Sequence, residues 1–161
     1  MTTGNRGTRH RMGGPRHIDF EAKPRSPVQL KKRVLFVCIG NSCRSQMAEG
    51  FARTYGDDII LASSAGLSPA PIVQPLTKQV LAQRNVRIED QFPKGMEILQ
   101  TQQFDLIVNM SGQKLPVGAS DTVRDWQVLD PIGQSESIYH AVAEQIEGLV
   151  MRLIIELRAK N

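Results

Sequence analysis

A cysteine that stands six positions before an arginine is the feature of this sequence that most directly indicates chemistry. Cys38 ends the apolar run Val34 to Val37, which is typical of a buried strand. After Arg44, apolar residues recur at spacings of three and four, which predicts a helix. A strand, a short polar loop and a helix start in this order point backbone N–H groups and the positive end of the helix dipole into one space. The pattern therefore predicts an anion-binding loop with Cys38 at its base and Arg44 at its side.

The chemistry expected of this loop is nucleophilic attack on a bound oxyanion. Inward-facing N–H groups, a helix N-terminus and a guanidinium all favour the thiolate form of Cys38. A thiolate is a nucleophile, and Arg44 can bind two oxygens of a tetrahedral anion whose central atom lies against the sulfur. Gly40 and Asn41 readily accept left-handed backbone angles, which we expect the tight loop to require. The residues expected to form the oxyanion loop are Ile39, Gly40, Asn41, Ser42, Cys43 and Ser45.

Nucleotide binding, zinc binding and a purely structural cysteine are the alternatives for this segment. The sequence contains no G-x-x-x-x-G-K-[ST] motif, so the loop is not that of the nucleotide-binding proteins. Cys38 and Cys43 have no nearby histidine and do not supply four zinc ligands. A structural cysteine does not explain why the strand, the Gly-Asn pair, the Arg-Ser pair and the helix occur together. We therefore expect a nucleophilic cysteine that uses no metal and no cofactor.

These residues carry a resemblance to a known family. The segment from Val37 to Ser45, followed by Gln46-Met-Ala-Glu-Gly50, resembles the low-molecular-weight protein tyrosine phosphatases, whose superfamily includes the thiol-coupled arsenate reductases. Further matches occur downstream in the same order, and the resemblance covers roughly residues 33 to 158. These matches are Ser64-Ala65-Gly66, Phe104-Asp-Leu-Ile-Val108 and Asp130-Pro131.

The resemblance implies a role for each matching residue. Cys38 would be the nucleophile and Arg44 the oxyanion binder, while Asn41 would hold the shape of the loop and Ser45 would stabilise the thiolate. Asp130 would be the general acid that protonates the leaving oxygen and then activates water to cleave a phosphocysteine. The alternative for Asp130 is an ordinary turn residue, because Asp-Pro pairs favour turns.

Two positions carry further implications of the resemblance. Cys43 lies in the loop beside the nucleophile, where it is either a redox-protective partner that forms a reversible disulfide or a small packing residue. Glu49 and Ser64 match positions where some reductases of this superfamily bind potassium. For Glu49 we favour an ordinary charged residue on the first helix.

The sequence departs from both branches of the superfamily. Many of the phosphatases place aromatic residues directly after the Asp-Pro pair, where this chain has Ile132-Gly133-Gln134, so phosphotyrosine is disfavoured as the substrate. Thioredoxin-coupled reductases need two further cysteines near the end of the third strand, where this chain has Asn109-Met110-Ser111-Gly112. The sequence holds only two cysteines, so that internal disulfide relay cannot operate.

Three functions therefore stay open. The main expectation is a phosphatase that hydrolyses a phosphate monoester, on a small molecule or a protein, through a phosphocysteine. The alternative is an arsenate reductase with one catalytic cysteine, an external thiol and a glutaredoxin-type partner. A non-catalytic module that binds oxyanions is the third, although the presence of cysteine, arginine and aspartate together favours an enzyme.

Alternating strands and helices predict the fold class. We expect strands at 33–38, 59–63, 104–110 and 122–129, with helices at 45–56, 75–84, 94–102 and from Ser137 onward. Short connections in such an alternation favour a parallel sheet covered on both faces. Together with the resemblance, this predicts a three-layer α/β fold with a central four-stranded parallel sheet and flavodoxin-like topology. Cys38 would lie at the carboxyl end of its strand, where open α/β sheets bind ligands.

Charge and composition divide the chain into a tail and a domain. The net charge is +4, yet residues 1–33 hold nine Lys and Arg against two acidic residues. We expect residues 1–31 to be a disordered basic tail and residues 32–161 a catalytic domain. Nucleic acid is not an expected partner, because the basic character belongs to the tail alone. No apolar stretch is long enough to cross a membrane, and a working thiolate suits the reducing cytoplasm.

Overall fold

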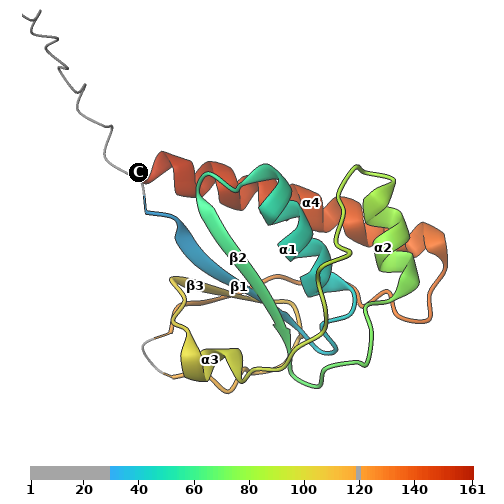
Figure 1. Cartoon of the computed structure of the whole chain (residues 1–161), viewed down its shortest axis with the longest axis horizontal. Helices are drawn as coiled ribbons and strands as arrows, with labels where there is room; N and C mark the ends of the chain where they lie inside the picture. Colours follow the sequence, from blue (N-terminus) through green and yellow to red (C-terminus); the bar gives the residue numbers. More distant parts are fainter. Residues whose placement is uncertain (1–29, 119–120) are drawn as a thin grey trace, which may run out of the picture.

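The computed structural model describes residues 30–118 and 121–161, so nearly all of the expected tail lies outside the described residues. Strands and helices alternate through most of the described chain (Figure 1). In order, the elements are β1 (Lys32–Cys38), α1 (Arg44–Tyr55), β2 (Ile60–Gly66), α2 (Pro75–Ala82), α3 (Ile98–Thr101), β3 (Leu106–Asn109), β4 (Val123–Asp125) and α4 (Glu136–Ala159).

The four strands form one parallel sheet in the order β2-β1-β3-β4. β1 lies between β2 and β3. After β1 the chain forms β2 on one side of it and then returns past β1 to form β3 on the other side. The carboxyl end of β1 is thus a point where the strand order reverses, and such points open a crevice for ligands. The expected three-layer α/β fold with a four-stranded parallel sheet is confirmed.

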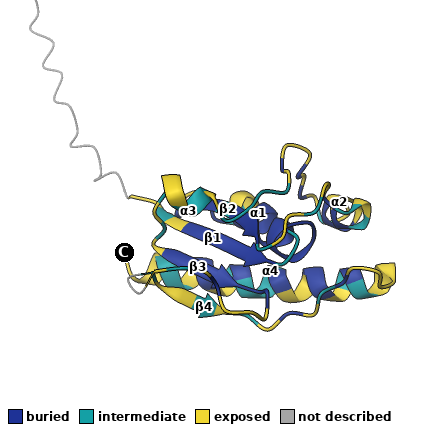
Figure 2. Cartoon of the chain, turned by 90° about the horizontal axis from the view of Figure 1, so that it is seen from below, coloured by how far each residue is buried: buried dark blue, intermediate teal, exposed yellow. Residues whose placement is uncertain are grey.

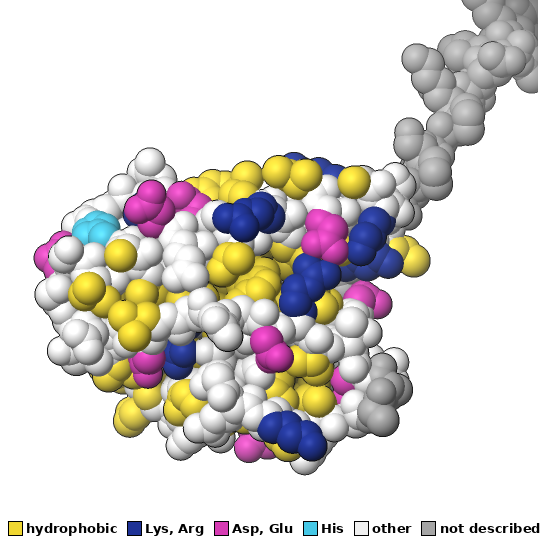
Figure 3. All heavy atoms as spheres, turned by 180° about the vertical axis from the view of Figure 1, so that it is seen from behind, with side chains coloured by type: hydrophobic (Ala, Val, Ile, Leu, Met, Phe, Trp, Pro, Cys, Tyr) yellow, Lys and Arg dark blue, Asp and Glu magenta, His cyan; other side chains and the backbone are white. Residues whose placement is uncertain are grey.

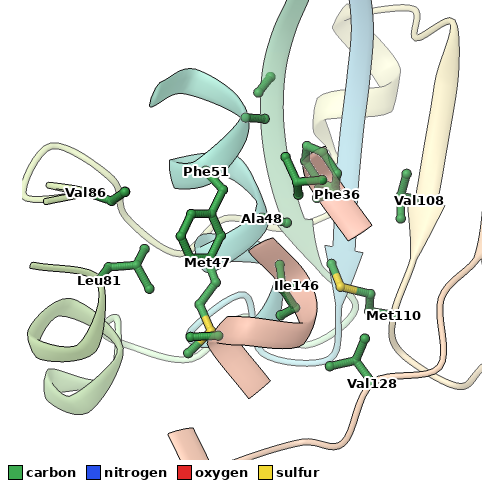
Figure 4. Close-up of a cluster of buried hydrophobic side chains, with 14 of the residues drawn as sticks. Phe36, Met47, Ala48, Phe51, Leu81, Val86, Val108, Met110, Val128 and Ile146 are labelled. Atoms are coloured by element: carbon green, nitrogen blue, oxygen red, sulfur yellow. The ribbon is translucent and has the colours of Figure 1, made fainter. Parts of the chain in front are cut away.

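Alternate residues of β1 pack into two separate cores, one on each face of the sheet. Val34 and Phe36 pack with α1, α2 and α4, whereas Leu35 and Val37 pack with the segment around α3. Figure 2 shows that the central strand is buried along most of its length. The larger core includes Phe36, Met47, Phe51 and Ile146 (Figure 4). Burial of both faces explains why β1 is an uninterrupted apolar run.

Four predicted elements are shorter than expected. The helix expected over 75–84 ends at Ala82, and the strand expected over 104–110 is limited to Leu106–Asn109. The other two differ more, and each has a structural reason. The helix expected over 94–102 is reduced to four residues, because its first residues pair with the sheet instead. Gly66 N–H donates to the Lys94 carbonyl at 2.8 Å, and Gly66 bridges to Gly95. The strand expected over 122–129 ends at Asp125, because the following segment turns toward Arg44 and places the Val128 carbonyl against it.

The last helix begins one residue earlier than expected, at Glu136. Ser135 caps it by accepting a hydrogen bond from the Ile138 N–H at 3.4 Å. Apolar side chains of α4, among them Val142, Ile146 and Leu153, are buried in the larger core, which holds α4 against the sheet. Within residues 30–118 and 121–161, no helix has both the length and the hydropathy that a bilayer span requires.

Candidate active site

The loop between β1 and α1 places Cys38 and Arg44 at its two ends, as the sequence predicts. Cys38 is the last residue of β1 and Arg44 is the first of α1. Asn41 has the expected left-handed backbone angle, with a φ of 49°. The expectation that Gly40 also adopts such an angle is wrong, since Gly40 is not among the described residues with positive φ. A single left-handed residue is sufficient to turn the loop, because the Asn41 side chain is held on both sides.

A hydrogen bond from Asn41 orients Ser45 toward Cys38, the predicted nucleophile. The Asn41 Nδ2 group donates to Ser45 Oγ at 2.7 Å, and Ser45 Oγ lies 2.9 Å from Cys38 Sγ. All three side chains are buried. Since Ser45 Oγ already accepts from Asn41, its own proton is free to point at the sulfur. This geometry favours a thiolate at Cys38, because a hydrogen bond to the charged form stabilises it.

Arg44 is fixed by carbonyl groups from two segments that lie far away in the sequence. Its Nη1 group donates to the carbonyls of Met110, which follows β3, and of Val128, the latter at 3.1 Å. The Nε group is buried and has no hydrogen-bond partner in the structure. A buried N–H group without an acceptor is costly. Arg44 thus holds a positioned donor that an oxyanion in the loop would satisfy.

The structure places Asp130 beside Arg44. The Asp130 Oδ2 atom is 3.5 Å from Arg44 Nη2, and Oδ1 accepts from the Ile132 N–H at 3.1 Å. The Asp130 side chain is 43% exposed, whereas that of Arg44 is only 7% exposed. The carboxyl group thus stands at the mouth of the loop with access to solvent. That position suits a group that exchanges protons with a leaving oxygen and with water.

Cys43 lies on the core side of the loop. Its Sγ atom is 3.6 Å from the Tyr139 hydroxyl on α4 and 3.9 Å from Ser42 Oγ. Burial raises the pKa of the Cys43 thiol, and burial together with this contact also raises the pKa of Tyr139. Both cysteines are free thiols. Cys43 therefore packs as a neutral thiol in this state, and its redox-protective role stays a prediction.

The potassium site that the resemblance implies does not fit this chain. Glu49 is on α1 as expected, but it is buried, and Ser64 is buried as well. The Lys94 ammonium lies 3.5 Å from Ser64 Oγ and 4.0 Å from Glu49 Oε1, and it donates to the Phe92 carbonyl at 3.2 Å. A positive charge already stands among these oxygens, so a potassium ion there would be repelled.

Three residues that sequence reasoning missed support the loop. Gln46 Nε2 donates to the Asn41 carbonyl at 2.9 Å, and the Lys94 N–H donates to Asn41 Oδ1 at 3.0 Å. Gly66 allows β2 to approach the loop, because an added Cβ would stand 2.7 Å from the Ile39 carbonyl oxygen. The Ser-Ala-Gly match carried a signal for Gly66, whereas nothing in the sequence indicated Lys94.

A cavity of about 1180 Å³ lies on the other side of Arg44, toward β3 and β4. Trp126 lines it and packs on Phe36 with ring centroids 5.9 Å apart. Seen from behind, the molecule gathers apolar side chains in a hollow that charged side chains border (Figure 3). Space next to Arg44 is thus available on the β4 side of the sheet.

Comparison with known proteins agrees with this geometry. The family model described as low molecular weight phosphotyrosine protein phosphatase matches residues 33–161. The chain belongs to this family. As a member of the low molecular weight phosphotyrosine protein phosphatase family, it conforms to the resemblance drawn from the loop sequence.

The relatives of this family member divide between the two named activities. It is 35% identical over 130 residues to a "Glutaredoxin arsenate reductase" from a Synechocystis strain, covering 78% of this chain and 98% of the relative. A solved "arsenate reductase in the phosphate binding state" matches with a TM-score of 0.69 and 33% identity, over 78% of this chain and 98% of the other. A low molecular weight protein tyrosine phosphatase from T. tengcongensis matches with a TM-score of 0.66 and 27% identity, over 79% of this chain and 100% of the other.

Proposed function

We propose that this protein is an arsenate reductase that uses Cys38 as its single catalytic cysteine and takes electrons from an external thiol. The observation that carries the proposal is the 35% identity to a relative named "Glutaredoxin arsenate reductase", over 98% of its length. Arsenate is a tetrahedral oxyanion that suits the loop and the unpaired Nε of Arg44. Met110 and Ser111 stand where thioredoxin-coupled reductases of this superfamily need a cysteine, so the reductant must come from outside.

The reaction can be written with the residues of this site. The Cys38 thiolate attacks arsenic, and one oxygen leaves as water after protonation by Asp130, which gives a Cys38–S–As(V) adduct. An external thiolate then attacks the Cys38 sulfur, and the S–As electron pair passes to arsenic. Arsenite is released and a mixed disulfide remains on Cys38. A second thiol attacks this disulfide, which frees Cys38 and yields the oxidised external disulfide.

Hydrolysis of a phosphate monoester is the second candidate. It is favoured by one observation, the exposed Asp130 carboxylate 3.5 Å from Arg44, since a phosphocysteine route needs an acid and base at that place. The substrate would be a small or non-tyrosyl ester, because Ile132 and Gly133 follow the Asp-Pro pair where many phosphatases place aromatic residues. Phosphate and arsenate have nearly the same shape, so the loop alone does not separate them.

Parallel assays of both reactions test the proposal. Wild-type protein is supplied with arsenate, glutathione and a glutaredoxin, and arsenite is measured, while hydrolysis of p-nitrophenyl phosphate is followed separately. We expect arsenite formation that needs both Cys38 and the thiol, with only slow hydrolysis. Fast Cys38-dependent hydrolysis without arsenite would instead make this protein a phosphatase. The Lys78→Met variant, changed at an exposed site on α2, is the matched control.

A further inference from the structure

A second polar network contacts the loop at Asn41. At its centre is Glu49, of which only 1% is exposed. One carboxylate oxygen, Oε2, has no hydrogen-bond partner in the structure. Burial raises the pKa of Glu49, while Lys94 and Arg53 act in the opposite direction. A buried carboxylate requires nearby positive charge, because its desolvation is otherwise not offset.

Lys94 brings its ammonium group to this carboxylate from a different part of the chain. Nζ is 4.0 Å from Glu49 Oε1, 3.5 Å from Ser64 Oγ and 3.2 Å from the Phe92 carbonyl oxygen. The Lys94 side chain is 26% exposed, whereas the other cation near Glu49, Arg53, is 47% exposed and lies one turn along the same helix. Lys94 is therefore the more deeply placed charge, and it connects α1, β2 and the segment before α3.

The main chain of Lys94 is also bound to the catalytic loop. Its N–H group donates to Asn41 Oδ1 at 3.0 Å. This bond orients the Asn41 amide so that Nδ2 faces Ser45, to which it donates at 2.7 Å. Ser45 is then free to donate to Cys38 Sγ, 2.9 Å away. Lys94 thus contacts the Glu49 carboxylate through its side chain, and through its main chain it contacts the hydrogen bonds that lead from Asn41 to Cys38.

We propose that Lys94 is a positioning residue for Cys38, acting as an internal cation that holds the Phe92–Lys94 segment against Asn41. The inference rests on the part of the proposed function that makes Cys38 the nucleophile. With the ammonium bound to Glu49, Ser64 and Phe92, the Lys94 N–H stays aimed at Asn41. Without it, Asn41 would lose the partner that fixes its amide, and Ser45 would no longer be held as a donor to the sulfur. The wild-type protein should consequently need no added monovalent cation.

The test is the reactivity of Cys38 in a Lys94→Met variant. Iodoacetamide alkylates thiolates, and fragment-ion mass spectrometry separates the Cys38 adduct from a Cys43 adduct. We expect alkylation of Cys38 to be about tenfold slower or more, because loss of the hydrogen bond from Ser45 removes a contact that stabilises the reactive thiolate. Lys78→Met should match the wild type. Alkylation of Lys94→Met at the wild-type rate would overturn the proposal.

Rescue of the Lys94→Met variant by added cations would distinguish a positioning role of Lys94 from a purely structural one. Added ammonium or potassium ions should restore part of the Cys38 reactivity in Lys94→Met, while leaving the wild type unchanged. The double variant Lys94→Met with Glu49→Gln should show no such rescue, since the carboxylate that would hold the ion is gone. Circular dichroism establishes that each variant is folded. A folded Lys94→Met protein that is slow and insensitive to both ions would contradict the proposal.

Assays of arsenate reduction by the same variants distinguish a failure of this inference from a failure of the proposed function. In arsenate reduction, kcat should fall while KM stays nearly constant, because the loop N–H groups and Arg44 that bind the anion are intact. Failure of the wild type to reduce arsenate would overturn the proposed function alone, since alkylation of Cys38 requires no substrate.

Discussion

The two sides of the active site are built in different ways. On the side of the proposed nucleophile (the nucleophile side), Cys38, Asn41 and Ser45 are buried and come from one continuous segment of the chain. On the side of the proposed acid (the acid side), Asp130 is 43% exposed and follows β4, an edge strand of three residues. Arg44 joins them, since it belongs to the loop by sequence and binds the carbonyls of Met110 and Val128 on the other side.

This difference indicates which side determines the kind of chemistry and which determines the substrate. A buried loop held by neighbouring residues presents the same nucleophile and the same oxyanion site to any tetrahedral anion. The Asp130 side chain is exposed, so it can face leaving groups and partners of different sizes.

Replacement of the nucleophile should have the largest effect. Cys38→Ser is expected to abolish arsenate reduction and ester hydrolysis, with a loss of about 10⁴-fold or more, because a serine hydroxyl is not ionised at neutral pH. Binding of arsenate or phosphate should persist, since the loop N–H groups and Arg44 remain. Steady-state rates and isothermal titration calorimetry measure the two properties. Retention of full activity by this variant would contradict the role of Cys38.

Replacement of Asp130 should change ester hydrolysis and oxyanion binding in opposite directions. Asp130→Asn is expected to slow hydrolysis of p-nitrophenyl phosphate by about 10²-fold or more, since it removes a proton donor and base. Oxyanion binding should instead become tighter, because a negative charge 3.5 Å from Arg44 Nη2 is lost. The kcat and the inhibition constant for phosphate report these effects. Equal losses in rate and binding would show that Asp130 acts through the loop and not at the mouth.

Sequence reasoning succeeded where the structure depends on local order along the chain. Apolar periodicity and short connections predict that Cys38 ends a strand and that a helix begins at about Arg44. They also predict the parallel sheet. The left-handed backbone of Asn41 was predicted from its residue type in a tight loop, although Gly40 does not adopt such an angle.

Contacts between distant segments could not be predicted in this way. The bond from Lys94 to Asn41 joins residues 53 positions apart, and the carbonyls that bind Arg44 come from positions 66 and 84 residues away. Backbone N–H and carbonyl groups carry no residue-specific signal, since every residue except proline has both. The predicted length of the 94–102 helix is wrong for the same reason, because the Lys94 carbonyl accepts a hydrogen bond from the distant Gly66 N–H.

A smaller effect is expected where β2 touches the loop. Gly66→Ala would put a Cβ 2.7 Å from the Ile39 carbonyl oxygen and 2.8 Å from the Asn41 nitrogen. Both are backbone atoms of the nucleophile side, so the variant should lose about 1–3 kcal/mol of unfolding free energy. Urea denaturation measures this loss. Gly148→Ala is the matched control, because no atom lies within 4 Å of its added Cβ and alanine favours the α4 helix. Unchanged stability of Gly66→Ala would mean that the loop is less rigid than its contacts indicate.

The smallest effect is expected on the acid side, where Arg124 on β4 pairs with Glu156 on α4. Arg124 Nη1 and Nη2 donate to the two Glu156 oxygens at 2.8 and 2.9 Å, and hydrogen bonds from Arg124 and Lys160 lower the pKa of Glu156 to about 2. The side chains are 40% and 35% exposed, so solvent weakens the pair, and Glu156→Gln should cost at most about 1 kcal/mol at pH 7. Because the folded pKa is depressed, the stabilisation is present above the ordinary pKa of 4.5 and is lost as the pH falls toward about 2. Urea denaturation of both proteins across this range should therefore converge at low pH. A difference that stays constant down to pH 2 would mean that Glu156 stabilises β4 through packing and not through its charge.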